Sequence, residues 1–206
     1  MIELAVLNRE GKTVETLAVN ESVLGGRVRL PLLKQAIVMY HANRRVGTAA
    51  TKNKSLVAGS TRKLYRQKGT GNARVGQVRT HKRVGGGVAF AKVARDFSQV
   101  MPKKQRRLAR DSAVLAKLLD QRVVVVSDLP LDRPKTKDFV GILGKLGITR
   151  SCLVAVKARD ANVYKSARNI PRVAVTPVTD LNAGQICGHD KVLFTKEALL
   201  SFLDRS

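Results

Sequence analysis

The segment from residue 59 to residue 74 holds the residue types best suited to chemistry, namely contact with a polyanion. It reads GSTRKLYRQKGTGNAR and interleaves cationic side chains with glycines and one aromatic ring, Tyr65. Arginine and lysine bind phosphates, glycine lets the backbone approach another molecule closely, and an aromatic ring can stack on a base. The segment therefore favours contact with folded RNA. A solvated flexible linker is the alternative, but a local concentration of cations is typical of nucleic-acid binding.

The surplus positive charge of the chain is concentrated around this segment. The formal net charge is +24, from 39 Lys and Arg against 15 Asp and Glu. Residues 44–110 carry 19 basic side chains and one acidic side chain, Asp96, so a third of the chain holds 18 of the 24 surplus charges. Such a surplus repels itself in a compact protein, and a polyanion that releases its counterions on binding is the usual reason to carry it. Composition therefore indicates a nucleic acid as the partner.

A second glycine cluster lies in the same region. Gly85, Gly86 and Gly87 precede Phe90, and here the backbone could press against RNA or turn sharply. Glycine suits both uses equally, so both interpretations stay open. His81 lies in a cationic run, which favours contact with RNA over binding of a metal ion.

No arrangement of residues is suited to catalysis. The GTG at 69–71 lacks the third small residue of a dinucleotide fingerprint, because Arg74 stands in its place and no strand precedes it. Gly144-Lys145 is followed by Leu146, where a P-loop needs Ser or Thr. The three histidines are isolated and the acidic residues are scattered rather than paired. We expect no general acid and base, no metal site, no cofactor and no enzymatic activity.

The cysteines and the hydropathy indicate the cellular compartment in which the chain is expected to function. Cys152 and Cys187 stand in apolar surroundings without the close pairs of a zinc site, so we expect two buried, reduced thiols. His41 and His189 have no partner at ligand spacing and are expected to be structural. No stretch approaches about 18 apolar residues, and the N-terminus is unlike a signal peptide. These features predict a soluble, cytosolic protein.

The sequence on either side of the basic region alternates apolar strands with helices. Strands are expected at 2–7, 12–17, 123–126, 152–156, 172–176 and 192–194, and helices are expected to begin at Pro31 and Pro102 and to span 136–146, 162–168 and 195–203. The first two strands could form a hairpin, and the others are uniformly apolar. This pattern predicts an α/β fold with a predominantly parallel sheet and helices on both faces, in three layers.

The basic region is predicted to interrupt a single domain that spans residues 1–206. Residues 46–100 show no helical or strand period and are expected to form an extended loop rich in Gly, Lys and Arg. We expect this loop to be disordered alone and ordered on its partner, since it has few apolar side chains. The helix that follows begins with cations, which oppose the helix dipole and suggest compensation by phosphates.

The run 59–74, the GGG with Phe90 and the helix start at 102–110 resemble, in order and spacing, the bacterial large-subunit ribosomal protein L four family. The resemblance covers the whole chain, and its most specific part is RQKGTG at 66–71 with Ala73-Arg74; PKTK at 134–137 also fits. It implies a globular domain on the outer side of the large subunit and a loop that threads large-subunit (23S-type) ribosomal RNA to the wall of the nascent-peptide exit tunnel. It also implies a role in early assembly and a place in the cytoplasmic ribosome.

The resemblance and the charge pattern together give the expected site. Partners would be large-subunit ribosomal RNA, neighbouring large-subunit proteins and, near the loop tip, the nascent peptide, with no membrane. The residues expected to bind RNA are Arg44, Arg45, Lys52, Lys54, Arg62, Lys63, Tyr65, Arg66, Gln67, Lys68, Gly69, Gly71, Arg74, Arg79, Lys82, Arg83, Gly85, Gly86, Gly87, Arg95, Lys103, Lys104, Arg106 and Arg107. Those expected at the tip are Arg66, Gln67, Lys68, Gly69, Thr70, Gly71 and Asn72.

Two departures and two alternatives accompany this interpretation. The chain has Leu64-Tyr65 where the family commonly shows Pro-Trp, and Asn72 where it commonly shows Arg. Asn72 leaves the loop tip with one cation fewer than is common in the family. This difference affects the expected tunnel contacts and macrolide response, but not the expected placement of the loop. A general nucleic-acid-binding protein is the first alternative function, and an RNA-modifying enzyme built on the α/β domain is the second.

Overall fold

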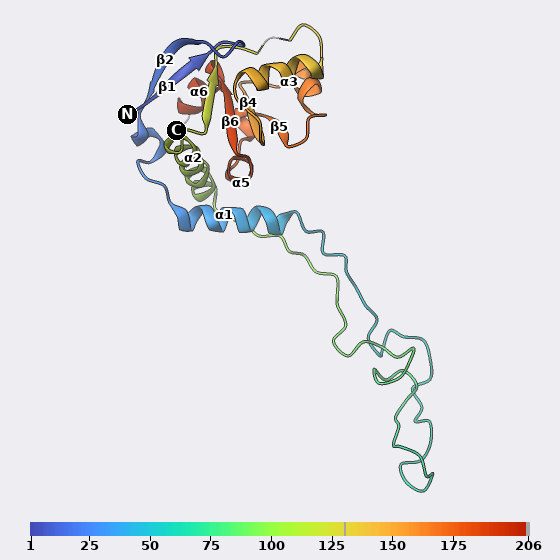
Figure 1. Ribbon diagram of the computed structural model, residues 1–206. Coiled ribbons are helices and arrows are strands. Elements are labelled where there is room, and N and C mark those ends of the chain that lie inside the picture. Colours follow the sequence, from blue (N-terminus) through green and yellow to red (C-terminus); the bar gives the residue numbers. More distant parts are fainter. Residues whose placement is uncertain (130, 205–206) are drawn as a thin grey trace. The chain divides into compact units, whose positions relative to one another are not determined.

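The structure is a computed structural model that describes residues 1–129 and 131–204 (Figure 1). The chain divides into two compact units. The first, which we call the globular unit, contains residues 1–41 and the described residues from 100 onward. The second, which we call the arm, contains residues 42–99.

The sheet of the globular unit has six strands. They are β1 (Ile2–Leu7), β2 (Thr13–Val19), β3 (Val123–Val126), β4 (Cys152–Val156), β5 (Val173–Pro177) and β6 (Lys191–Thr195), in the order β2-β1-β3-β6-β4-β5. Only β1 and β2 pair antiparallel, as a hairpin, and every other neighbouring pair is parallel. The predicted hairpin and the predominantly parallel sheet are therefore confirmed.

The helices cover both faces of this sheet (Figure 1). They are α1 (Leu30–Asn43), α2 (Lys103–Leu119), α3 (Thr136–Lys145), α4 (Ala161–Ala167), α5 (Ala183–Gly188) and α6 (Lys196–Leu203), with short 3-10 helices at Glu21–Leu24 and Val178–Asp180. Successive strand residues point to opposite faces. Leu153 packs in a cluster with α1, α2, α5 and α6, whereas Val154 packs in a cluster with α3 and α4. Burial on both faces confirms the three layers.

The ends of the helices follow local chemistry that the sequence shows. Thr195 caps α6, because its Oγ1 accepts a hydrogen bond from Ala198 N at 3.3 Å. Gly147 stops α3 with φ +66°, while Ile148 N donates to Leu143 O at 2.9 Å. The predicted bounds, 136–146 and 195–203, agree with these ends to within one residue.

Helix α5 was not predicted. Its six residues include two glycines, which lower the intrinsic preference for a helix. Asn182 caps it by accepting from Gln185 N at 2.9 Å, and this residue type was the available signal. Gly184 is needed there, since a Cβ atom would lie 2.7 Å from the Tyr40 ring.

The same helix overturns one prediction about the cysteines. Cys152 is buried in β4, as expected, but Cys187 is exposed on α5. Ala183 and Ile186 point from α5 into the core, and the next residue along a helix is turned by about 100° from its neighbour. Cys187 is therefore directed to the surface, and an apolar neighbourhood in sequence did not imply burial.

Two further observations bear on the chain as a whole. Within the described residues, no helix combines the length and the apolar character needed to cross a membrane. Every buried hydrophobic residue that the structure describes lies outside residues 42–99. The arm therefore contributes nothing apolar to the core of the globular unit.

This division predicts that the globular unit folds without most of the arm. We expect deletion of residues 54–95, with the ends joined by a short Gly/Ser linker, to leave a single cooperative unfolding transition, because the deleted segment removes no core side chain. Urea unfolding followed by circular dichroism measures this. As a positive control for damage, Phe194→Ala in the full chain should lower the free energy of unfolding by about 3–5 kcal/mol. A broad, non-cooperative transition in the deletion variant would show that the boundary is wrong.

Candidate nucleic-acid interface

The arm consists of two limbs joined by hydrogen bonds without forming a sheet. We define the outgoing limb as residues 42–58, the end segment as residues 59–77 and the returning limb as residues 78–99. The bonds that backbone groups and neutral side chains make between the limbs are Asn43 Nδ2 to Gln99 O (3.2 Å), Gln99 N to Asn43 Oδ1 (2.7 Å), Arg95 N to Gly47 O (3.2 Å), Thr51 N to Lys92 O (2.9 Å), Lys92 N to Thr51 Oγ1 (2.8 Å) and Val88 N to Lys52 O (2.9 Å). Beyond the end of α1, the arm has no helix, and its only β contact is the isolated bridge between Lys63 and Gln77. This confirms the predicted lack of regular elements.

The second glycine cluster lets the limbs pack closely against each other. A Cβ atom on Gly87 would lie 2.2 Å from Lys54 N, and one on Gly86 would lie 1.9 Å from Thr80 O. Gly85 differs, because it has φ +77° and open space around it. These contacts give Gly86 and Gly87 a use that neither interpretation had named, namely close packing within the arm.

The end segment folds back on itself through its own polar side chains. Arg66 Nη2 donates to Gly69 O at 2.6 Å, and Gly69 has φ +78°. The Tyr65 hydroxyl donates to Ala73 O. The Tyr65 ring is consequently held within the segment and half-buried, whereas the ring of Phe90 on the returning limb is 96% exposed. Phe90 is thus the more accessible aromatic ring, although the sequence drew attention to Tyr65.

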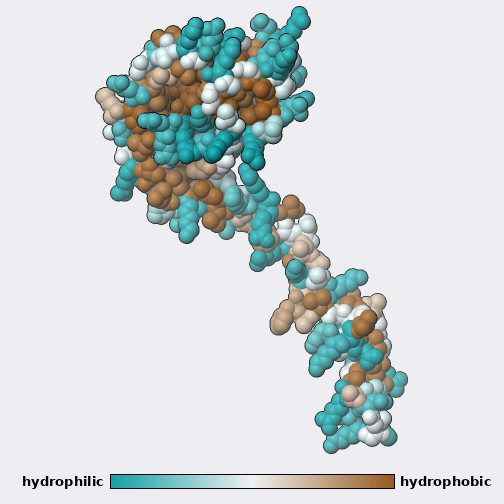
Figure 2. Space-filling view, in the orientation of Figure 1, coloured by the Kyte–Doolittle hydropathy of each residue, from teal (hydrophilic) through white to brown (hydrophobic). Residues whose placement is uncertain are grey.

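Nearly all the cations of the arm are exposed, and almost nothing in the arm neutralises them. Those exposed are Arg44, Arg45, Lys52, Lys54, Arg62, Lys63, Arg66, Lys68, Arg74, Lys82, Arg83, Lys92 and Arg95. In Figure 2 the surface of the arm alternates between hydrophilic and apolar residues. Asp96, the only carboxylate in the arm, accepts hydrogen bonds from Ser98 N (2.8 Å) and Ser98 Oγ (2.6 Å), and these bonds lower its pKa. The arm is therefore a cationic surface with one ionised carboxylate that is already hydrogen-bonded.

Arg79 is the exception among these cations. It is half-buried, and its Nη1 donates to Val57 O on the opposite limb at 3.0 Å. A Cβ atom on Gly59 would lie 3.1 Å from the Arg79 side chain, so the Arg79 side chain passes close to the backbone of Gly59. Arg79 was predicted to bind RNA, and the structure gives it a role in holding the limbs together.

Two other arginines stack on one ring near the start of the arm. The guanidinium carbon of Arg45 lies 3.9 Å from the Phe97 ring centroid, and that of Arg95 lies 4.3 Å from it. Both guanidinium groups therefore contact the same aromatic ring. Stacking on an aromatic ring holds a planar guanidinium in place while its N–H edges stay free to donate.

The start of α2 carries the remaining predicted cations. Lys103, Lys104, Arg106 and Arg107 are exposed, and the first turn has neither an acidic residue nor a side-chain cap. Lys103, Arg106 and Arg107 line a hollow of about 220 Å³ with Tyr40. Burial raises the pKa of Tyr40, and the Arg106 charge partly opposes this. The cations that oppose the helix dipole are therefore gathered on an exposed surface, as the sequence indicated.

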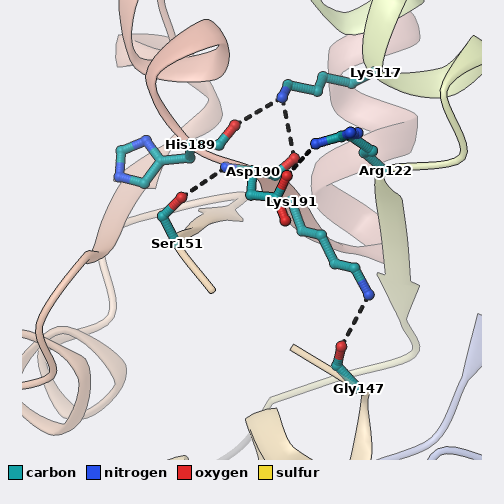
Figure 3. Close-up of polar contacts among 7 residues, drawn as sticks. All are labelled: Lys117, Arg122, Gly147, Ser151, His189, Asp190 and Lys191. Atoms are coloured by element: carbon teal, nitrogen blue, oxygen red, sulfur yellow. Dashed lines mark hydrogen bonds and ion pairs between the residues drawn. The ribbon is translucent and has the colours of Figure 1, made fainter. Parts of the chain in front are cut away.

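Other cations of the globular unit are used internally. Arg110 pairs with Asp111 at 2.8 Å and lies 4.7 Å from the centroid of the Phe202 ring. Three more cations lie around Asp190 (Figure 3). Lys117 Nζ donates to His189 O (2.7 Å) and to Asp190 O (3.1 Å). Arg122 pairs with the Asp190 carboxylate, and Lys191 Nζ donates to Gly147 O at 2.9 Å. These bonds tie the amino ends of the strands together. His189 belongs here too, since its Nδ1 lies 2.8 Å from Gln185 O, which fits the structural role expected for it.

The structure adds residues that sequence reasoning did not select. Lys92 is exposed and lies between two apolar residues, so it did not stand out as part of a cationic cluster. Phe97 attracted no attention, although the arginines at 45 and 95 stack on it. Arg95 lies two positions before Phe97, and that spacing was the only local signal.

Comparison with known proteins identifies the family. Residues 17–205 match the model of the Ribosomal protein L4/L1 family. The chain belongs to this family. The suspected membership is thus confirmed over nearly the whole chain.

Individual relatives agree with this assignment. The chain is 42% identical over 200 residues to the large ribosomal subunit protein uL4 of Rhodopirellula baltica, covering 97% of the chain and 90% of the relative. It is 39% identical over 199 residues to that of Natranaerobius thermophilus (97% and 96%). It is 42% identical over 198 residues to that of Dehalococcoides mccartyi (96% and 94%). Members of the Ribosomal protein L4/L1 family thus align with the basic region and with the α/β elements alike.

The cysteines give a test of the globular unit. At neutral pH we expect one thiol of the native chain, Cys187, to react with a maleimide and Cys152 to resist, because burial raises the pKa of Cys152 to about 12. Partial burial raises the pKa of Cys187 too, while Lys117 opposes this, so its labelling should accelerate as pH rises. Mass spectrometry counts the labels, with Cys187→Ser as the control that should take none until denaturant is added. Rapid double labelling of the native chain would contradict the burial of β4.

The pKa of Cys152 also has a consequence for stability. The folded chain keeps the thiol proton up to about pH 12, whereas an unfolded cysteine loses it from about pH 9. The folded state therefore binds more protons in this interval, and the Cys152 contribution to the free energy of unfolding should fall as pH rises from 9 to 12. Cys152→Ala should remove that part of the pH dependence in urea unfolding. An identical pH profile for the variant would contradict it.

Proposed function

We propose that this protein is a structural constituent of the large ribosomal subunit that binds large-subunit ribosomal RNA through the arm and the start of α2. The observation that carries this is the exposed cationic surface of the arm, with a single hydrogen-bonded carboxylate and no buried apolar side chain. The protein would act by neutralising and positioning phosphates rather than by catalysis. Membership in the Ribosomal protein L4/L1 family supports this over a general nucleic-acid-binding role.

The finer parts of the proposal concern partners and place. The end segment, with Arg66 to Asn72 at its tip, would reach the wall of the nascent-peptide exit tunnel and lie near the nascent peptide. The globular unit would contact neighbouring ribosomal proteins on the outer side of the subunit, in the cytoplasm. It would aid early assembly, since an arm without a core of its own is suited to ordering with RNA as the RNA folds.

The enzyme alternative receives no support from the edge of the sheet where it would need a cofactor. Ligands of open α/β sheets bind beyond the carboxyl ends of the strands. There the structure has a hollow of about 200 Å³ beside Val156 and Pro177. Sites for small molecules and cofactors usually measure about 300–1,000 Å³. That hollow is smaller than such a site. A second hollow at the same edge measures about 760 Å³, but charged side chains such as Arg9, Asp132 and Lys137 make up most of its lining, whereas ligand sites are lined mainly by apolar side chains. Neither hollow favours the enzyme alternative.

The proposal predicts a steep salt dependence of RNA binding. If about 6 to 10 phosphates are engaged, the affinity for a large-subunit ribosomal RNA transcript should fall by about 10³ to 10⁵ between 50 and 200 mM salt. Filter binding across a salt series measures this. Duplex DNA of equal length at matched salt is the control, and it should bind more weakly because the shape and 2′-OH contacts differ. A flat titration would refute RNA binding by the arm, and equal affinity for DNA would favour the general nucleic-acid-binding alternative.

The packing of the limbs predicts which glycine matters for binding. We expect Gly87→Ala to weaken binding to the same transcript, because a Cβ atom 2.2 Å from Lys54 N forces the limbs apart. Gly76→Ala is the matched control, since its Cβ atom would lie 3.8 Å from Thr80 at an ordinary contact distance. Both variants should keep the wild-type melting temperature of the globular unit. Equal affinities of the two variants would show that the crossing of the limbs does not shape the bound arm.

A further inference from the structure

The two stacked arginines at the start of the arm border a hollow that the proposed function does not explain. It measures about 830 Å³ and is lined by residues 45–49 of the outgoing limb and by residues 91–95 and Phe97 of the returning limb. This lies within the range of about 300–1,000 Å³ that small-molecule sites occupy. A hollow of this size is large enough for one nucleotide.

The lining has two chemical characters. Arg45, Lys92 and Arg95 supply positive charge, while the other side chains, apart from Phe97 and Thr48, are alanine or valine. Val46 is 81% exposed and Val93 is 78% exposed, so apolar surface is presented to whatever enters. A nucleotide has the matching parts, because its phosphate is anionic and its base has flat apolar faces.

The arginines are held ready for such a ligand. Their contact with the Phe97 ring limits the freedom of both guanidinium groups, so less side-chain freedom is lost when they donate to a phosphate. In the part of the chain that the structure describes, neither guanidinium has a carboxylate partner or a side-chain hydrogen bond. Asp96 lies between Arg95 and Phe97 in sequence, but its carboxylate is bonded to Ser98 and does not line the hollow.

The backbone keeps the two limbs at this spacing. Arg95 N donates to Gly47 O at 3.2 Å, and Gly47 has φ +74°. A Cβ atom at Gly47 would lie 2.1 Å from Arg95 O and 3.0 Å from the Phe97 ring. The paired bonds between Asn43 and Gln99 join the limbs nearby. The hollow therefore has walls that are fixed by local bonds.

From these observations we propose that this hollow binds one unpaired nucleotide of the RNA, with its phosphate on the edges of Arg45 and Arg95 and its base against Val46 and Val93. The inference rests on the proposed function and names the element of RNA structure that this part of the arm takes. The nucleotide must be unpaired, because a base held in an A-form helix cannot present its faces to side chains.

The test uses the full chain, a large-subunit ribosomal RNA transcript and 2′-OH acylation, which reports unpaired nucleotides. Arg45→Lys with Arg95→Lys keeps the net charge but removes the planar forks. The wild-type chain should protect one or two unpaired nucleotides from acylation, and we expect the double variant to leave the same nucleotides reactive. The variant should also bind the transcript with an affinity lower on the order of tenfold, while the slope of affinity against salt concentration stays unchanged. Arg150→Lys with Arg168→Lys is the matched control, since both arginines are exposed on the globular unit, away from the arm and from the start of α2.

Phe97→Leu is an independent route to the same result, because it keeps both arginines and removes the ring on which they stack. It should expose the same nucleotides as the lysine pair, whereas Phe90→Leu should leave them protected. Protection of those nucleotides in both the lysine pair and Phe97→Leu, with the affinity within twofold of wild type, would overturn the site while leaving RNA binding by the arm intact. A wild-type chain that protects no nucleotide would instead refute the proposed function, and the site with it.

Discussion

Mutual repulsion among the cations of the arm is the constraint on which the rest of the structure depends. Residues 42–99 contain 14 Lys and Arg side chains and one carboxylate, and none of their apolar side chains is buried. Such a segment cannot collapse on a core of its own. Its limbs are joined instead by backbone groups and by neutral side chains such as Asn43 and Thr51. Apart from Arg79, which is half-buried, the cationic side chains are exposed at the surface.

The globular unit, unlike the arm, is built around buried apolar side chains. Its sheet is buried on both faces, so strand residues one position apart pack in different clusters, as Leu153 and Val154 do. The elements that flank the arm belong to one of these clusters, which contains Met39 of α1 and Met101 just before α2. The chain can therefore leave and re-enter the globular unit from elements anchored in one core. This arrangement lets a long basic segment be inserted without loss of apolar burial.

The cations of this protein fall into groups that charge alone does not distinguish. Lys117, Lys191 and Arg122 donate to backbone carbonyls or pair with a carboxylate, and they hold the strand ends together. Arg79 joins the two limbs of the arm. Arg45 and Arg95 both lie over the Phe97 ring, and neither has a carboxylate partner among the described residues. Cations bonded within the globular unit stabilise its fold, whereas the exposed cations of the arm have no carboxylate partner among the described residues.

The sequence by itself determined the fold class, the family and the location of the surplus charge. Uniformly apolar strands, Thr195 as a cap and Gly147 as a stop are local signals, so they could be interpreted one segment at a time. Contacts between distant residues decided the rest. The stacking of Arg45 on Phe97, the clash that keeps Gly87 a glycine and the burial of Arg79 all join positions on opposite limbs or in separate segments. Cys187 needed the structure for the same reason, because the direction a side chain takes depends on which face of its helix packs against the core.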